Sequence, residues 1–299
     1  SRGLHISTRW AAYRRIGSEC RNMDSIKVKN FIIVVLLIVN AILLSVFISD
    51  TVRERSRTDS AIDGAVALLA ENGITVAPDV DFSERQLETL QVARDTGLEQ
   101  QSVSNILGDT TVSDPGGNIL LYFGANGEAR FSGTGSVEMN LRSGEFRSGD
   151  PLETARTFAS DLDCETMSEP VSSSVDADTL EGSLDLCCSI DGVRVVNCVL
   201  SFTFASGGDL MGVYGIRVLD TVTSSQQEST IDVPTVLMRF LNIVLDGGHV
   251  CSSLDELELC YNMRANAAGE GELIPVWRIA TDTGEFYINA HTGLEETIT

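Results

Sequence analysis

The residue types best suited to catalysis lie closest together at His249 and Cys251. A thiol beside an imidazole can act as a nucleophile, and two side chains at this spacing share one face of an extended segment. The alternative is a loop histidine that follows Gly247 and Gly248 next to a buried thiol. The chain also lacks the G-x-S-x-G turn that presents a nucleophilic serine. We therefore expect no enzymatic activity and assign no catalytic residue.

Motifs for metals and cofactors are missing as well. The sequence contains no H-E-x-x-H, no EF-hand loop and no C-x-x-C, so the usual ligand spacings for zinc and calcium are not met. The stretch Gly133-Thr134-Gly135-Ser136 is too short for a phosphate-binding loop or a dinucleotide fingerprint. We expect neither a metal nor a cofactor.

Cysteine usage leaves two interpretations open. Six cysteines follow residue 50, namely Cys164, Cys187, Cys188, Cys198, Cys251 and Cys260. An even number permits disulfides in an oxidising compartment, and plain buried thiols are the alternative. A two-residue turn at Asp191-Gly192 would place Cys187 opposite Val196, too far from Cys198 for an unstrained bridge.

Composition excludes one class of partner. The 299 residues carry 21 Lys and Arg against 43 Asp and Glu, a formal net charge of −22. Neutralising phosphates requires clustered basic side chains, so nucleic acid is not an expected partner. An apolar content of 43% suffices to fill the cores of two domain-sized units.

One long apolar run lies near the beginning of the chain. Phe31–Ser49 contains no charged residue and is flanked by Lys27 and Lys29. Its length matches the hydrocarbon core of a bilayer, whereas a cleaved signal peptide is shorter and a core helix carries charges on one face. We interpret residues 31–49 as a transmembrane anchor and residues 1–30 as a short cytoplasmic segment. Residues 1–22, upstream of Met23, are interpreted as translated upstream sequence or a tail.

The distribution of basic residues predicts a type II orientation in the cell membrane. Residues 1–30 hold seven basic groups, which favours a cytoplasmic N-terminus and an extracytoplasmic C-terminal part. Within the run, Asn40 lies beside Ala41 and Ser45, where small residues and an amide can join two membrane helices. The alternative is that Asn40 bonds its own backbone or water.

Three further residues could bind a partner. Trp277, Arg278 and Tyr287 belong to the last predicted hairpin, and these residue types are enriched at binding hot spots. They are equally consistent with ordinary cross-strand packing.

Helix and hairpin signals alternate after residue 50. Apolar periodicity and capping residues predict helices over residues 60–71, 150–162 and 234–245, with a weaker one over 83–94. Turn signals predict hairpins around residues 125–127, 191–192 and 282–284. The pattern indicates an α+β protein with one module over residues 50–149 and a second over 150–299, each a helix packed on an antiparallel sheet.

Two stretches carry a family resemblance. Met23–Phe47 (MDSIKVKNFIIVVLLIVNAILLSVF) and Leu273–Gly293 (LIPVWRIATDTGEFYINAHTG) together resemble the YycI and YycH regulatory proteins of Gram-positive two-component systems. Ile106-Leu107-Gly108, Leu121-Tyr122 and Asn126-Gly127 are similar to the first module of that family. The six cysteines and the near absence of lysine depart from the pattern.

The resemblance implies both a fold and a partner. It implies PepSY-like α+β modules without enzymatic activity. It also implies regulation of a sensor histidine kinase of the WalK/YycG type through transmembrane and extracytoplasmic contacts, with a paralogous YycH-like protein as a further partner. The alternative function is a PepSY-like extracytoplasmic binding module for a protease or a cell-wall ligand.

Overall fold

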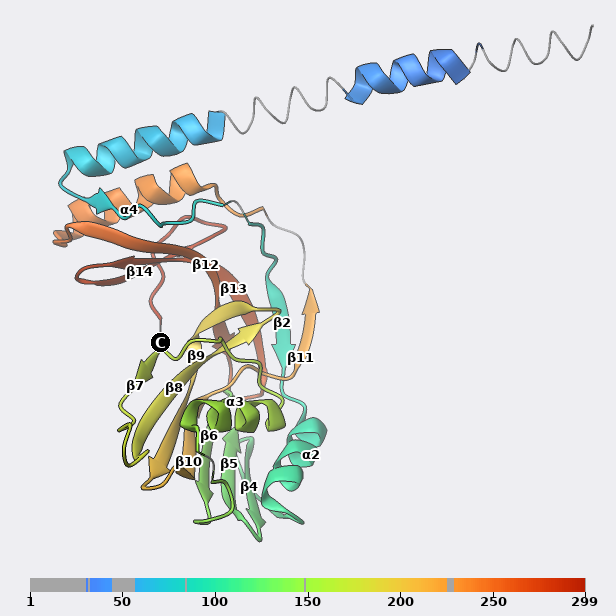
Figure 1. Ribbon diagram of the computed structural model, residues 1–299. Helices are drawn as coiled ribbons and strands as arrows, with labels where there is room; N and C mark the ends of the chain where they lie inside the picture. Colours follow the sequence, from blue (N-terminus) through green and yellow to red (C-terminus); the bar gives the residue numbers. More distant parts are fainter. Residues whose placement is uncertain are drawn as a thin grey trace, which may run out of the picture. The chain divides into compact units, whose positions relative to one another are not determined.

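The computed structural model describes residues 31, 33–44, 57–83, 85–147, 149–224 and 229–298. The chain divides into two compact units, Ser1–Asp63 and Gly64–Thr299. The first unit contains a helix over residues 33–44 and the beginning of a helix over residues 57–71. The second unit contains the elements described below (Figure 1).

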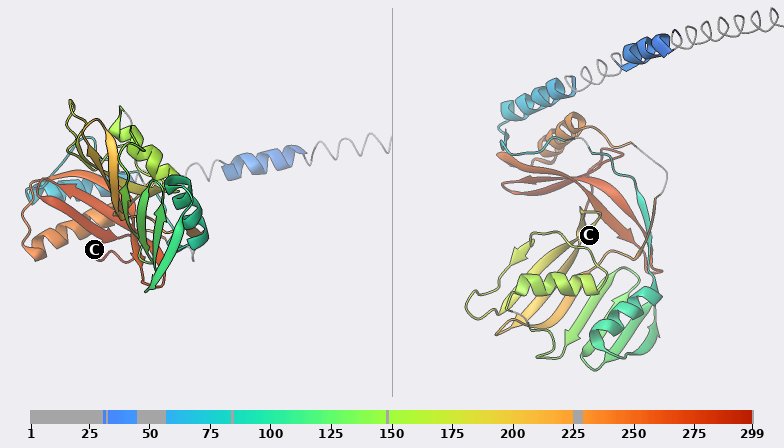
Figure 2. Two further views of the ribbon diagram at one scale, coloured as in Figure 1. Left: turned by 90° about the horizontal axis from the view of Figure 1, so that it is seen from below. Right: turned by 45° about the vertical axis from the view of Figure 1, so that its right-hand side comes forward.

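Three helices of the second unit are α2 (Thr96–Leu107), α3 (Pro151–Asp161) and α4 (Val233–Gly247). The strands are β1 (Thr75–Val76), β2 (Leu90–Ala93), β3 (Thr111–Gly116), β4 (Ile119–Gly124), β5 (Gly127–Ser132), β6 (Ser136–Leu141), β7 (Ser172–Ser173), β8 (Gly182–Ile190), β9 (Val193–Ala205), β10 (Asp209–Ile216), β11 (Thr221–Ser224), β12 (Ser253–Ala265), β13 (Glu270–Thr281) and β14 (Gly284–Asn289). In the described residues, these fourteen strands join into one curled mixed sheet (Figures 1 and 2).

One part of the sheet is antiparallel, with strand order β8-β9-β10-β6-β5-β4-β3. Helices α2 and α3 pack against β4, β5 and β8. Between them lies a core in which the rings of Phe158 and Phe202 meet edge to face. Asp150 caps α3 by accepting hydrogen bonds from the backbone N–H groups of Leu152 and Glu153, as the helix signal predicted. Asp95 caps α2 in the same way.

The other part of the sheet contains β11-β2-β13-β12, with β14 paired to β13 and β1 paired to β12. Helix α4 packs against β14, where Phe240 and Phe286 lie edge to face at 5.3 Å. The two parts meet where β12 runs parallel to β9, paired at Tyr261 and Val195. Beyond that pair, the Asn197 side-chain amide bonds both backbone groups of Met263, at 2.7 and 2.8 Å.

The local predictions agree with the structure at several elements. The helices expected over residues 60–71, 150–162 and 234–245 are confirmed, with helix ends that differ by a few residues. The three predicted hairpins are also confirmed. At Asp191 and Gly192, φ values of +50° and +73° form the tight turn that this residue pair favours. A register shift within β8 pairs Cys187 with Val199, so the expected pairing with Val196 is wrong.

The predicted fold class is wrong. A transmembrane helix followed by two PepSY-like modules is not what the described residues form, because one large curled mixed sheet with few helices dominates them. None of the described helices combines the length and the apolar character that crossing a membrane requires.

One further correction concerns an individual element. The helix expected over residues 83–94 is wrong, because β2 occupies Leu90–Ala93 and pairs with β13. The division of the chain at residues 149 and 150 stays a prediction, as does the location at a cell membrane.

Candidate binding groove

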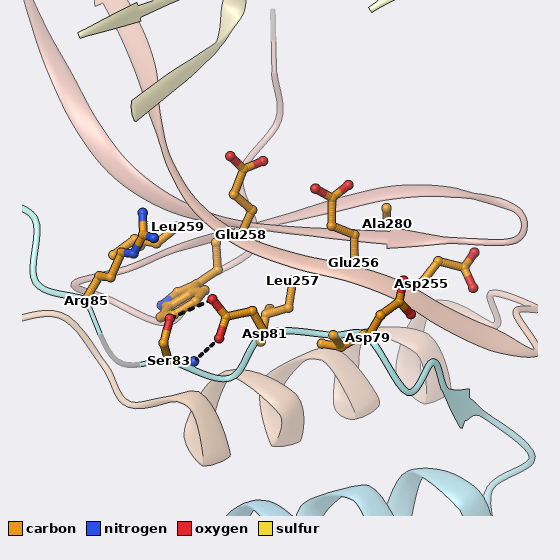
Figure 3. A pocket seen from close by; sticks show the side chains of 12 residues that line it. Asp79, Asp81, Ser83, Arg85, Asp255, Glu256, Leu257, Glu258, Leu259 and Ala280 are labelled. Atoms are coloured by element: carbon orange, nitrogen blue, oxygen red, sulfur yellow. Dashed lines mark hydrogen bonds between the residues drawn. The ribbon is translucent and has the colours of Figure 1, made fainter. Parts of the chain in front are cut away.

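A hollow of about 560 Å³ lies between strand β12 and the segment over residues 79–85 (Figure 3). It is lined by Asp79, Val80, Asp81, Ser83, Arg85, Asp255, Glu256, Leu257, Glu258, Leu259, Trp277 and Ala280. Five of these residues are carboxylates and one is a guanidinium, so the lining is strongly negative. We call this feature the acidic groove.

The groove exists because the segment after β1 leaves β12 and returns farther along it. At its start, the Ala77 N–H donates to the Leu254 carbonyl at 2.9 Å. At its end, the Tyr261 hydroxyl donates to the carbonyl of Glu88 at 3.1 Å. On this edge, β12 pairs with β1 as far as Leu254 and with β9 at Tyr261. Between these two residues, the edge is not paired with any described strand.

The direction of the β12 backbone follows from its bonds farther along the strand. The N–H and C=O groups of Met263 both point toward β9, where the side chain of Asn197 hydrogen-bonds to them. Alternate residues of a strand direct their N–H and C=O groups to the same edge, and the register with β13 is regular from Glu256 to Ala265. Leu257 and Leu259 therefore direct theirs into the groove.

A short turn shapes the opposite wall. Asp81 accepts hydrogen bonds from the backbone N–H of Ser83 at 2.9 Å and from its hydroxyl at 2.8 Å (Figure 3). These bonds favour the charged carboxylate and lower the pKa of Asp81. Thr230 holds the segment farther along, since its hydroxyl donates to the carbonyl of Arg85 at 3.3 Å. The wall therefore keeps a fixed negative charge at neutral pH.

The two faces of β12 present different chemistry to the groove. Leu257 and Leu259 are buried, and Leu259 is the register partner of Trp277 on β13. Glu256 and Glu258 extend to the other side of the strand, away from Asp81 (Figure 3). One side of this edge is therefore apolar and the other anionic.

The anionic side has more carboxylates than guanidiniums. Arg278 contacts Glu256 at 2.6 Å, Glu258 at 3.6 Å and Glu285 at 2.5 Å, while Arg194 contacts Glu258 at 3.0 Å. Burial alone would raise the pKa of Glu285, but hydrogen bonds from Arg278 and Tyr287 lower it. Three carboxylates thus share two guanidiniums, and the Glu256 side chain remains 51% exposed.

Trp277 adds an unused donor to the groove. The residue is only 3% exposed, and its indole N–H has no hydrogen-bond partner among the described residues. A buried donor without a partner costs about 1–3 kcal/mol, so such groups are rare in native proteins. An acceptor on a bound ligand would satisfy it.

The structure separates the partner-binding residues that the sequence indicated. Trp277 lines the groove, whereas Arg278 and Tyr287 lie opposite each other on β13 and β14 and both bind Glu285. Asn40 and Ala41 lie on the exposed helix over residues 33–44, and Ser45 lies outside the described residues. Their role in partner binding stays a prediction.

The residues considered for catalysis do not form an activated pair. The ring of His249 packs edge to face on Phe286 at 5.3 Å. Burial, together with the charge of Asp282, raises the pKa of the Cys251 thiol, which opposes thiolate formation. No hydrogen bond joins His249 to Cys251 in the portion of the chain that is described.

All six cysteines after residue 50, Cys251 included, are unbridged thiols, and five of them are buried. Within the described residues, no group of three or more His, Cys, Asp or Glu side chains could hold a metal ion. The positions of the five buried cysteines match the interpretation as buried thiols.

A second charged cluster lies in the interior, away from the groove. Glu99 on α2 accepts from Arg94 at 2.6 Å, from Arg217 at 3.1 Å and from the hydroxyl of Tyr122 at 2.8 Å, while Arg217 also pairs with Asp220. The four charged side chains are at most 3% exposed, and their charges cancel. This cluster fixes α2 to the sheet.

Sequence reasoning missed Asp79, Asp81, Glu256 and Glu258, because carboxylates are too frequent in this chain to single any out. One signal was available in β12. Leu257 and Leu259 alternate with Glu256 and Glu258, which is typical of a strand.

Comparison with known proteins adds little. No family model matches the sequence. No curated protein matches it either. The structure is similar to the crystal structure of an uncharacterized protein from Eubacterium rectale, with 12% sequence identity over 76% of this chain and 90% of that chain, and a TM-score of 0.48. None of these findings tests the resemblance to YycI and YycH, which stays a prediction.

Proposed function

We propose that the protein is a non-enzymatic binding module whose ligand carries positive charge and occupies the acidic groove. The observation that supports this proposal is the groove itself, where five carboxylates and one guanidinium surround a cavity of about 560 Å³. Structural charges are normally neutralised by partners, as in the interior cluster around Glu99. An excess of one sign around a hollow instead favours a ligand of the opposite sign.

Asp79 and Asp255 are the carboxylates best suited to a test. Both are exposed, and neither forms an ion pair with another described residue. Replacing them with asparagine therefore removes charge from the groove without breaking a contact of the fold. Because the whole chain carries −22, any polycation will bind it weakly, and the control must change net charge equally.

The experiment measures binding of a hexa-arginine peptide to the full chain by calorimetry. The variant Asp79→Asn/Asp255→Asn should bind about 5- to 30-fold more weakly, at about 0.5–1 kcal/mol for each charge. The control Asp178→Asn/Glu181→Gln removes two exposed charges far from the groove and should bind as the parent does. Equal losses in both variants would show that only net charge matters and would overturn the proposal.

Regulation of a sensor histidine kinase stays a prediction of the family resemblance. No described helix is suited to span a membrane, and Ser45 of the predicted contact lies outside the described residues, so the transmembrane contact also stays a prediction. Crosslinking the protein in its own cell would test this partner. Recovery of a kinase, lost on Asn40→Leu, is the result that the resemblance predicts.

A further inference from the structure

We infer that the ligand of the acidic groove is an extended segment of another protein, with basic and apolar residues in alternation, which adds as a strand to the open edge of β12. This inference rests on the proposed function, because it names the chemistry of the ligand at the same groove. It is carried by the backbone of β12, by its two faces and by Trp277.

The open edge supplies the main-chain contacts. Leu257 and Leu259 each direct one N–H and one C=O into the groove, between the pairing with β1 at Leu254 and the pairing with β9 at Tyr261. An added strand would satisfy these four groups as a neighbouring strand does in any sheet. The stretch from Glu256 to Cys260 spans about 16 Å, which limits the added strand to about five residues.

The faces of β12 specify which side chains the added strand carries. Successive residues of a strand point to opposite faces, so alternate residues of the ligand would lie beside Glu256 and Glu258, and the others beside Leu257 and Leu259. The first set fits lysine or arginine, because Glu256, Glu258 and Glu285 together outnumber the guanidiniums of Arg194 and Arg278 by one charge. The second set fits apolar side chains.

Trp277 is an independent indication of a ligand. Its buried indole N–H has no partner among the described residues, and the residue lines the same groove. An extended peptide brings carbonyl groups that can accept from this donor, whereas a polyamine brings donors alone. The groove therefore favours a polypeptide over a small polycation.

The opposite wall of the groove leaves room for a ligand strand to enter beside β12. Residues 80–83 and 85 are not paired to β12 by the described backbone hydrogen bonds, and this part of the chain is anchored on its two sides by Ala77 and Glu88. A strand that enters between this segment and β12 would displace no described pairing. Asp79 and Asp81 would add negative charge along its outer side.

The test uses a five-residue acetylated peptide of alternating valine and lysine, together with two N-methylated versions. One version is methylated at the valine nitrogens and the other at the lysine nitrogens, so that charge and side chains stay the same. In a strand, alternate N–H groups point to opposite edges, so only one of the two sets faces β12. We expect one version to bind at least 10-fold more weakly than the other, measured by calorimetry with the full chain.

The possible outcomes distinguish the two proposals. If the unmodified peptide binds in a manner that depends on Asp79 and Asp255 but both methylated versions bind equally well, the groove binds cations and strand addition is overturned. If the unmodified peptide does not bind while hexa-arginine does, strand addition is overturned and the proposed function stands. If neither ligand binds, or each binds the Asp79→Asn/Asp255→Asn variant and its control equally, the proposed function itself is wrong.

Hydrogen exchange provides the measurement on the protein side. The amide hydrogens of Leu257 and Leu259 should exchange at least 10-fold more slowly when the unmodified peptide is bound, and the methylated version that binds weakly should not protect them. Protection of both amides without peptide, in a chain that sediments as a dimer, would identify a second copy as the occupant and overturn the assignment to a basic segment.

Discussion

Two clusters of arginine and carboxylate side chains in this protein are built from the same groups but differ in burial and in balance. Around Glu99, two guanidiniums and two carboxylates lie at most 3% exposed and cancel in charge. Around Arg278, three carboxylates share two guanidiniums, and Glu256 and Glu285 remain 51% and 41% exposed. The difference teaches that ion pairs alone do not mark a site. A cluster whose charges cancel and whose side chains are buried is structural. A cluster with excess charge of one sign beside a hollow is a candidate binding surface.

The largest expected effect concerns the buried cluster. Replacing Glu99 with alanine leaves Arg94 and Arg217 buried without their shared carboxylate. Breaking a buried ion pair in this way typically lowers the free energy of unfolding by about 3–5 kcal/mol. Urea denaturation of the full chain measures the change, with Glu138→Ala on the exposed pair to Arg130 as control. A loss below about 1 kcal/mol would show that this cluster does not hold the fold.

An intermediate effect should appear at alkaline pH. Burial raises the pKa of the Cys164 thiol to about 11, although the nearby Arg217 guanidinium acts in the opposite direction. The unfolded thiol titrates near about 8.5, so the folded protein holds this proton more tightly. Stability from this group is therefore complete below about pH 8.5 and lost as the pH rises through 11, by an amount on the order of 3 kcal/mol.

Denaturation curves at intervals from pH 8 to 11 check this expectation. Cys164→Ala should flatten the decline, while other buried thiols with raised pKa values, such as Cys188 and Cys198, retain part of it. An unchanged slope in the variant would mean that Cys164 is accessible to water.

The smallest effect on stability is expected at the groove. Glu256→Gln removes one carboxylate from Arg278, which still contacts Glu258 and Glu285. Exposed ion pairs contribute about 0–1 kcal/mol, so the free energy of unfolding should change by less than about 1 kcal/mol. The same denaturation assay measures it. A loss above about 2 kcal/mol would place this cluster with the structural one and remove the contrast.

The sequence predicts the local elements well and the long-range ones poorly. Helix α3 was found because Asp150 and Pro151 mark its beginning, and the hairpin at Asp191-Gly192 was found because the turn requires that pair. Helix α2 was missed because Gly97 and several polar residues weaken its pattern, although Asp95 caps it. The segment at β2 has helical spacing, but pairing with β13 makes it a strand.

The groove was beyond local reasoning for a related reason. Trp277 was singled out by its residue type, but the carboxylates that surround it come from segments separated by about 175 positions. Only the return of the chain to β12 brings Asp79 and Asp81 opposite Leu257. The hydrophobic periodicity within one segment carries no information about which distant segment it will contact. The apolar run at residues 31–49 lies partly outside the described residues, and no described helix is suited to span a membrane.

The pairing of β1 and β2 with β12 and β13 has a consequence for the synthesis of this protein. Thr75 pairs with Ser253, so β1 must wait for a partner made more than 170 residues later. β2 pairs first with β11, about 130 residues later, and then with β13. The ribosome adds about 5–20 residues per second, which leaves the early strands unpaired for roughly ten seconds or longer. Contacts of such sequence separation also slow folding. A nascent chain would therefore have no groove until its last strands emerge, and its early strands are where a chaperone would be needed.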